Sequence, residues 1–80
     1  MSDFWQHIPE TLLEQEDSID LLAAKDGNFR EVCRDFDDCV DALRRWEASG
    51  KPEAGARAGE YRDLLAALQT EIERFLKKRA

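Results

Sequence analysis

The chain has 80 residues, of which 38% are charged and 42% are hydrophobic, so it holds one domain at most and is neither membrane-like nor of low complexity. Its net charge of −6 disfavours nucleic acid as the main partner. The longest apolar run, Leu64 to Leu68, is far shorter than the roughly 20 residues of a membrane span, and the acidic N-terminus lacks the apolar segment of a signal peptide. We therefore expect a single cytoplasmic domain over residues 1–80 with no membrane partner.

The first predicted elements are an aromatic arm at residues 1–8 and a helix at about residues 10–25. Pro9 suits the start of this helix, because its missing N–H has no intrahelical partner there. The pair Asp17 and Ser18 marks a point where the helix can kink or restart. Large apolar residues of the arm and helix either pack on the chain's own bundle or anchor another protein. These candidate interaction residues are Phe4, Trp5, Ile8, Leu12, Leu13 and Ile19.

A break at Asp26-Gly27-Asn28 leads into a second helix at about residues 29–48. Gly27 can take the left-handed conformation that ends a helix, and Asn28 can cap the next one, with Glu31 completing a capping box. Asp41 and Arg45 form a favourable i,i+4 pair on the polar face. The apolar stripe is wide enough for a bundle core and comprises Phe29, Val32, Cys33, Phe36, Cys39, Val40, Leu43 and Trp46.

The turn Ser49-Gly50-Lys51-Pro52 separates this helix from a third one at about residues 53–78. Gly55 and Gly59 weaken its first turns by roughly 1 kcal/mol each relative to alanine. Its seam alternates spacings of four and three, which is an a/d heptad pattern, and runs through Ala54, Ala58, Tyr61, Leu65, Leu68, Ile72 and Phe75.

The short turn folds the third helix back on the second, so that residue i pairs with about residue 101 − i, a register estimated from the centre of the turn. Trp46 then faces Gly55, and we expect the two glycines to leave room for this side chain. The predicted fold is thus an all-α antiparallel hairpin preceded by a shorter helix. The predicted hairpin core is Phe29, Cys33, Phe36, Val40, Leu43, Trp46, Ala58, Tyr61, Leu65, Leu68, Ile72 and Phe75.

The two cysteines, Cys33 and Cys39, are predicted to be unpaired. Six residues apart on one helix, their Cα atoms are separated by about 9 Å, whereas a disulfide needs roughly 4.4–6.8 Å. Their place on the apolar stripe predicts core packing, with an intermolecular disulfide or a redox role as the alternative. Unpaired thiols are typical of a reducing compartment, which agrees with a cytoplasmic location.

No group of residues in the sequence has the spacing of a catalytic or metal site. His7 is the single histidine and is far in sequence from both cysteines, and no CxxC, HxxxH or glycine-rich phosphate motif occurs. Adjacent carboxylates such as Asp37 and Asp38 point apart on a helix, so we interpret them as solvated. We expect no enzymatic activity, no metal and no cofactor.

Charge is distributed unevenly along the chain. Residues 1–40 hold eleven acidic and three basic residues, and residues 41–80 hold seven acidic and nine basic residues, which gives −8 and +2. This asymmetry is typical of segments or subunits that pair antiparallel. The basic cluster Arg74, Lys77, Lys78 and Arg79 compensates the helix dipole, with nucleic-acid binding as a weaker interpretation.

The stretch Leu21–Arg30, which reads LLAAKDGNFR, resembles the YdcH-like family of small bacterial proteins, in which an apolar pair and an acidic turn precede a Phe-Arg helix start. The segments Cys33–Asp38 and Tyr61–Ile72 are similar to the family's two helices. The resemblance covers about residues 19–76, with Gly27 where proline is common and no counterpart before Ile8. It implies an antiparallel hairpin of unassigned biochemical function.

The core of an 80-residue chain rarely contributes more than about 3–5 kcal/mol unaided, and disulfides and metals are not expected here. We therefore expect a non-enzymatic interaction protein that self-associates as a dimer or larger helical bundle. The alternative is an accessory subunit that binds a different protein through the arm and the first helix.

Overall fold

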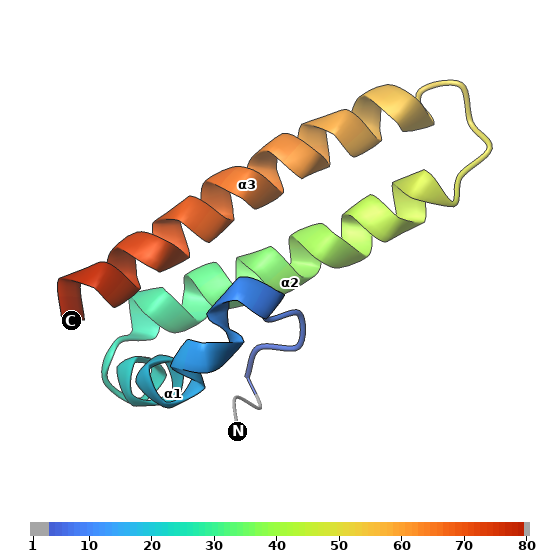
Figure 1. Ribbon diagram of the computed structural model, residues 1–80. Coiled ribbons are helices and arrows are strands. Elements are labelled where there is room, and N and C mark those ends of the chain that lie inside the picture. Colours follow the sequence, from blue (N-terminus) through green and yellow to red (C-terminus); the bar gives the residue numbers. More distant parts are fainter. Residues whose placement is uncertain (1–3, 80) are drawn as a thin grey trace.

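The computed structural model describes residues 4–79, and the regular elements within that range are all helical. A 3₁₀ helix, η1 (Glu10–Gln15), leads into α1 (Glu16–Lys25), which is followed by α2 (Gly27–Glu47) and α3 (Ala54–Arg79). Figure 1 shows α2 and α3 as an antiparallel hairpin, with the arm, η1 and α1 at the end where α2 begins and α3 ends. The all-α hairpin prediction is confirmed, and residues 1–3 of the predicted arm lie outside the described range.

The predicted helix at residues 10–25 is two segments of different type. The 3₁₀ segment ends at Gln15 and α1 begins at Glu16, so the change occurs before the predicted kink at Asp17 and Ser18. The carbonyl of Pro9 accepts a hydrogen bond from the N–H of Leu12 at 2.9 Å, which starts the 3₁₀ segment. Leu12 and Ile19 are both buried, so the two segments present one continuous apolar side to the hairpin.

The start of α2 corrects the predicted cap. Asp26, and not Asn28, is the N-cap, because its carboxylate accepts the N–H groups of Asn28 at 2.9 Å and Phe29 at 3.3 Å. Aspartate caps as well as asparagine, so the helix begins at Gly27 instead of residue 29. Within residues 4–79 no glycine has a positive φ, so Gly27 is an ordinary first-turn residue and not a left-handed terminus.

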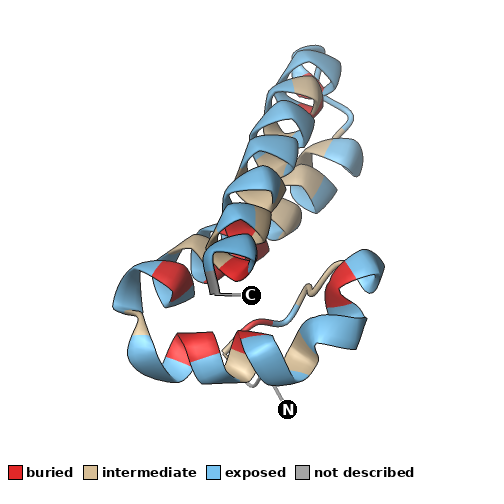
Figure 2. Cartoon of the chain, turned by 60° about the vertical axis from the view of Figure 1, so that its left-hand side comes forward, coloured by how far each residue is buried: buried red, intermediate tan, exposed pale blue. Residues whose placement is uncertain are grey.

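Burial divides the molecule into two regions, which Figure 2 shows by colour. We define the base as residues 4–41 with 65–79, and the tip as residues 42–64. In the base, the arm, η1 and α1 cover the hairpin, and their contact buries a continuous core of Trp5, Leu12, Ile19, Leu22, Ala23, Phe29, Cys33, Phe36, Ile72 and Leu76. In the tip, the buried residues are three alanines, Ala42, Ala54 and Ala58.

The predicted hairpin core is divided between the two regions. Phe29, Cys33, Phe36 and Ile72 are buried in the base, and Val40, Leu65, Leu68 and Phe75 are partly buried against them. Ala58 is buried in the tip, whereas Leu43, Trp46 and Tyr61 are only partly covered there. A pair of helices encloses small side chains along its line of contact, but the larger ones extend beyond this line to the surface.

The two glycines of α3 do not have the predicted role. A Cβ atom at Gly55 or Gly59 would meet no atom within 4 Å, so neither glycine is needed to make room for Trp46. Trp46 and Gly55 do line the same shallow hollow at the surface, as the register predicts. At the base, the rings of Phe29 and Phe75 lie 5.6 Å apart, so Phe29 reaches one helical turn past its predicted partner, Ile72.

Candidate interaction surfaces

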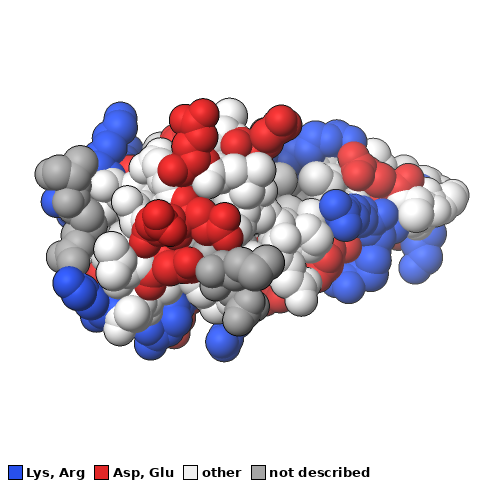
Figure 3. Space-filling model, turned by 60° about the horizontal axis from the view of Figure 1, so that its bottom comes forward, with Lys and Arg blue, Asp and Glu red and all other residues white. Residues whose placement is uncertain are grey.

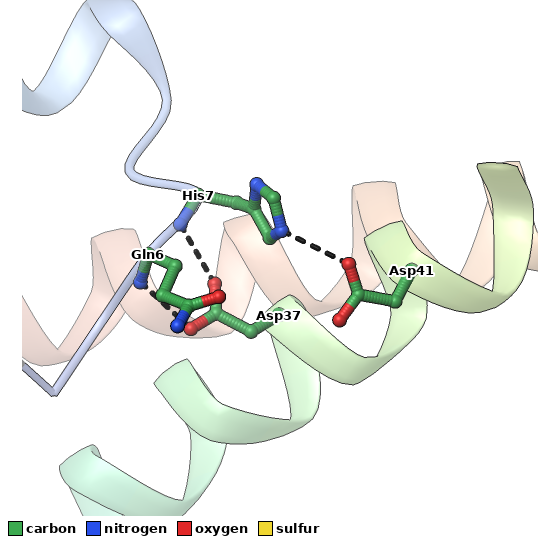
Figure 4. A network of polar contacts seen from close by, with 4 residues as sticks. All are labelled: Gln6, His7, Asp37 and Asp41. Carbon is green, nitrogen blue, oxygen red and sulfur yellow. Dashed lines mark hydrogen bonds and ion pairs between the residues drawn. The ribbon is translucent and has the colours of Figure 1, made fainter.

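The N-terminal arm is held on α2 by one buried carboxylate. Asp37 is 8% exposed, and its two oxygens accept the backbone N–H groups of Gln6 and His7, each at 2.8 Å. One turn further along α2, Asp41 lies 3.1 Å from Nε2 of His7. Figure 4 shows the two carboxylates side by side beneath the arm. Because each oxygen of Asp37 has its own donor, the burial of this charge is compensated by charge-assisted hydrogen bonds.

We call the contact of Asp37 with the backbone N–H groups of Gln6 and His7 the clamp. The clamp and the neighbouring Asp41 correct two sequence interpretations. Asp37 was expected to be solvated like Asp38, but the arm covers it and only Asp38 is exposed. Asp41 pairs with His7, and no ion pair with the predicted partner Arg45 is present among the described residues. The available signal was an acidic residue directly after the core residue Phe36, but a partner 30 residues away in the chain cannot be read from helical spacing.

Aromatic rings fix the arm above the clamp. The ring of Trp5 stands edge-on to Phe36 at 5.6 Å, and Phe4 lies 6.5 Å from Phe29. Tilted and edge-to-face pairs at these distances are favourable. Trp5 is 2% exposed, but its indole N–H has no hydrogen-bond partner, which makes its burial less stabilising than its area suggests.

The candidate interaction residues of the arm and first helix are therefore used mostly within the chain. Trp5, Leu12 and Ile19 are buried, and Phe4 and Ile8 are partly buried against the same core. Of the six, Leu13 alone is exposed, at 50%. The arm and α1 pack on their own hairpin, so another protein could bind Trp5 only after the arm had detached from α2.

The two cysteines are free and buried on α2. Burial, together with the negative charge of Asp37, raises the pKa of the Cys33 thiol to about 12. Burial also raises the pKa of Cys39, whose thiol donates to the carbonyl oxygen of Tyr61 at 3.3 Å. Both groups therefore stay protonated at neutral pH, which makes them poor nucleophiles and poor metal ligands.

A shallow groove between α2 and α3 is left uncovered by the arm and α1. We call it the distal groove, and it is lined by Asp35, Asp38, Cys39, Ala42, Arg45, Tyr61, Leu64 and Leu68. At 100° per residue, Cys39 and Ala42 point away from Asp37, so the groove lies on a different side of α2 from the arm. Tyr61 and Leu64 also line an adjoining hollow that contains Trp46, and Leu64 is 48% exposed.

Acidic side chains gather on one part of the surface, whereas basic side chains are found at both ends of the molecule. Figure 3, which views the face that carries the arm and α1, shows acidic groups gathered over the base and basic groups both toward the loop end and around the opposite end. At the far end of α3, Arg74, Lys77 and Lys78 are exposed around Phe75, and Glu71 lies 4.0 Å from Arg74. The side chain of Arg79, the fourth member of the predicted basic cluster, lies outside the described part.

The described residues include no cluster of three or more histidine, cysteine or acidic side chains placed to hold a metal ion. Within the same range, every helix is too short or too polar to cross a bilayer. The fold and its surfaces define a helical hairpin that an N-terminal segment braces at one end. Comparisons with family models, curated proteins and solved structures found no match to this chain. The resemblance to the YdcH-like family stays a prediction.

Proposed function

We propose that this chain is a non-enzymatic cytoplasmic protein that associates with copies of itself through helical packing. The observation that carries this proposal is the burial of the tip. Its buried residues are alanines, while Leu43, Trp46 and Tyr61 are partly covered and Leu64 is 48% exposed. Adjoining apolar side chains left open on a small domain are typical of an interaction surface.

Self-association would complete the tip as the arm and α1 complete the base. Two hairpins packed together form a four-helix bundle, in which large side chains of facing helices lie inside. The uneven charge of the sequence supports association of like copies, since the acidic first half of one chain can contact the slightly basic second half of another.

Sedimentation equilibrium over a wide concentration range, in reducing buffer, tests this proposal. We expect a dimer or larger species whose mass stays constant well above its dissociation constant. The reducing buffer excludes an intermolecular disulfide as the cause. A monomer at every concentration would overturn the proposal.

A second candidate function is binding of a different protein through η1 and α1. Leu13 and Leu21 favour it, because they are 50% and 64% exposed on these segments. An affinity pull-down that loses one defined partner with Leu21→Asp would support this function, with Leu64→Asp as the control that retains it. Nucleic-acid binding through Arg74, Lys77 and Lys78 is the least favoured function, and absence of salt-dependent binding at low ionic strength would exclude it.

A further inference from the structure

We infer that two copies of this chain pack their distal grooves together about a two-fold axis, with the α2 helices antiparallel and Asp38 of each copy opposite Arg45 of the other. This inference rests on the proposed self-association and specifies its geometry. It requires that the groove be open, that its lining residues lie on one side of each helix, and that its charges complement themselves under a two-fold rotation.

The groove is open because the arm and α1 use the other side of the hairpin. On α3, Leu76 is buried beside η1, where Leu12 lines the same hollow. Leu64 is about 120° away from Leu76 around the helix axis, which places it on the uncovered side. A second copy can therefore reach the groove without displacing the arm.

The residues that line the groove have the spacing of a helix-packing seam. On α2, Asp35, Asp38, Ala42 and Arg45 follow one another at intervals of three, four and three. On α3, Tyr61, Leu64 and Leu68 continue the pattern with intervals of three and four. These intervals keep residues on one side of a helix, as in the facing helices of a bundle.

The charges of the seam determine the direction of packing. The α2 seam is acidic toward the base, at Asp35 and Asp38, and basic toward the loop, at Arg45. In an interface about a two-fold axis, the same surface of each copy faces the other. The acidic end of one seam therefore lies opposite the basic end of the other when the two α2 helices run in opposite directions. Asp38 and Arg45 are seven residues apart, about 10 Å along the helix, and the small residue Ala42 lies between them where the axis would pass.

Both charges are available for a second copy. Asp38 and Arg45 are exposed, and the side chain of neither makes a hydrogen bond or ion pair with another described residue. Arg62 and Glu47, by contrast, form a pair within the chain at 3.0 Å. Exposed ion pairs between subunits determine orientation more than affinity, so the affinity would come from Leu64, Tyr61 and Trp46.

A charge-exchange experiment tests the geometry. The first variant, Arg45→Asp, has acidic groups at both ends of the α2 seam. The second variant combines Asp38→Arg with Asp35→Asn and has basic groups at both ends. We expect the dissociation constant of each variant alone to be about tenfold higher than that of the unmodified chain. An equimolar mixture should form the heterodimer, because each Asp then faces an Arg at both pairs. Sedimentation equilibrium measures all three samples.

Two controls separate the possible failures. Arg44→Asp changes the same charge on the neighbouring residue, which does not line the groove, and should leave the dissociation constant within about twofold. Leu64→Glu should abolish association, whereas Leu21→Glu, on α1, should not. Far-UV circular dichroism checks that every variant remains helical.

The outcomes distinguish this inference from the function on which it rests. If the unmodified chain is monomeric at all concentrations, self-association itself is wrong. If the unmodified chain associates but the two charge variants associate equally well on their own, or their mixture fails to recover, the two-fold arrangement of the α2 helices is wrong while self-association stands.

Discussion

The base and the tip are built from the same two helices, yet they bury different kinds of side chain. In the base the arm, η1 and α1 form a second layer, and Trp5, Phe29 and Ile72 are 2% exposed or less. In the tip no second layer is present among the described residues, and only alanines are buried. A helical hairpin alone buries a narrow strip, so a third segment, or another subunit, is needed to enclose large side chains.

The largest expected loss of stability comes from a charge introduced into the core of the base. Phe36→Asp should unfold the protein, because Phe36 is 4% exposed and an unpaired buried charge costs about 3–5 kcal/mol, comparable with the whole stability of so small a domain. Leu64→Asp, the matched change in the tip, should remain helical because Leu64 is 48% exposed. Far-UV circular dichroism compares the two. A folded Phe36→Asp variant would show that the core is placed wrongly.

Removing the anchor of the arm is expected to have the next largest effect. Trp5→Ala should lower the free energy of unfolding by about 2 kcal/mol, since truncation of a core tryptophan costs about 3–5 kcal/mol and loss of a partnerless buried N–H returns about 1–3 kcal/mol. Trp46→Ala, in the tip, should cost about 1 kcal/mol. Urea denaturation at low protein concentration measures both. Equal effects would mean that the arm does not brace the base.

The clamp provides a more specific test of comparable size. Asp37→Asn should destabilise the protein by about 1.5–3 kcal/mol, because an amide has one acceptor oxygen and its NH₂ group would face a second N–H. Asp41→Asn should cost less than about 1 kcal/mol, since Asp41 is half exposed. Urea denaturation compares these two variants as well. If Asp41→Asn proved the more harmful, His7 and not the backbone pair would hold the arm.

The base should also respond to alkaline pH through Cys33. Its thiol has a pKa of about 12 when folded against 9.0 as the ordinary value, so the unfolded chain releases this proton first. This contribution to stability is complete below about pH 9 and is lost as the pH rises toward about 12. Cys33→Ala lacks it, so the difference in unfolding free energy between the two proteins should shrink from pH 8 to pH 10. A constant difference would contradict the burial of the thiol.

The smallest expected effect is a gain of stability in the tip. Gly55→Ala should raise the free energy of unfolding by about 0.4–1 kcal/mol, because the new methyl group meets no atom within 4 Å and alanine favours the helix. Ala56→Gly, at the exposed neighbouring position, should lower it by about the same amount. Thermal denaturation detects both changes. A loss of stability in Gly55→Ala would indicate that the glycine has a packing role in the assembled protein.

Sequence reasoning predicted the helices of the hairpin well because their signals are local. The heptad spacing of α3 and the stripe of α2 follow from side-chain direction on a helix, and the structure has both helices within two residues of the predicted bounds. The cap was misplaced because Asp26 and Asn28 are equally good caps, and only the geometry of the chain decides between them.

The candidate surface was harder to predict because it depends on which part of the hairpin the N-terminal segments cover. Helical spacing could not show that Trp5 meets Phe36 or that Asp37 holds the arm, since these pairs are about 30 residues apart in sequence. It also placed Leu43, Trp46 and Tyr61 in one core with Phe29, because a seam appears uniform along its length. The arm, η1 and α1 cover the base and leave the tip open, and their position depends on tertiary contacts that helical spacing does not reveal.

The clamp at Asp37 recognises peptide N–H groups and not side chains, and this affects how the chain can vary. Every amino acid except proline carries that N–H, so positions 6 and 7 can accept most replacements while the arm stays attached. Genetic change would be tolerated at the contact itself and resisted at Trp5 and Asp37. A scan of all substitutions at Gln6 should accordingly find proline the most destabilising, since it alone removes one of the two donors to Asp37.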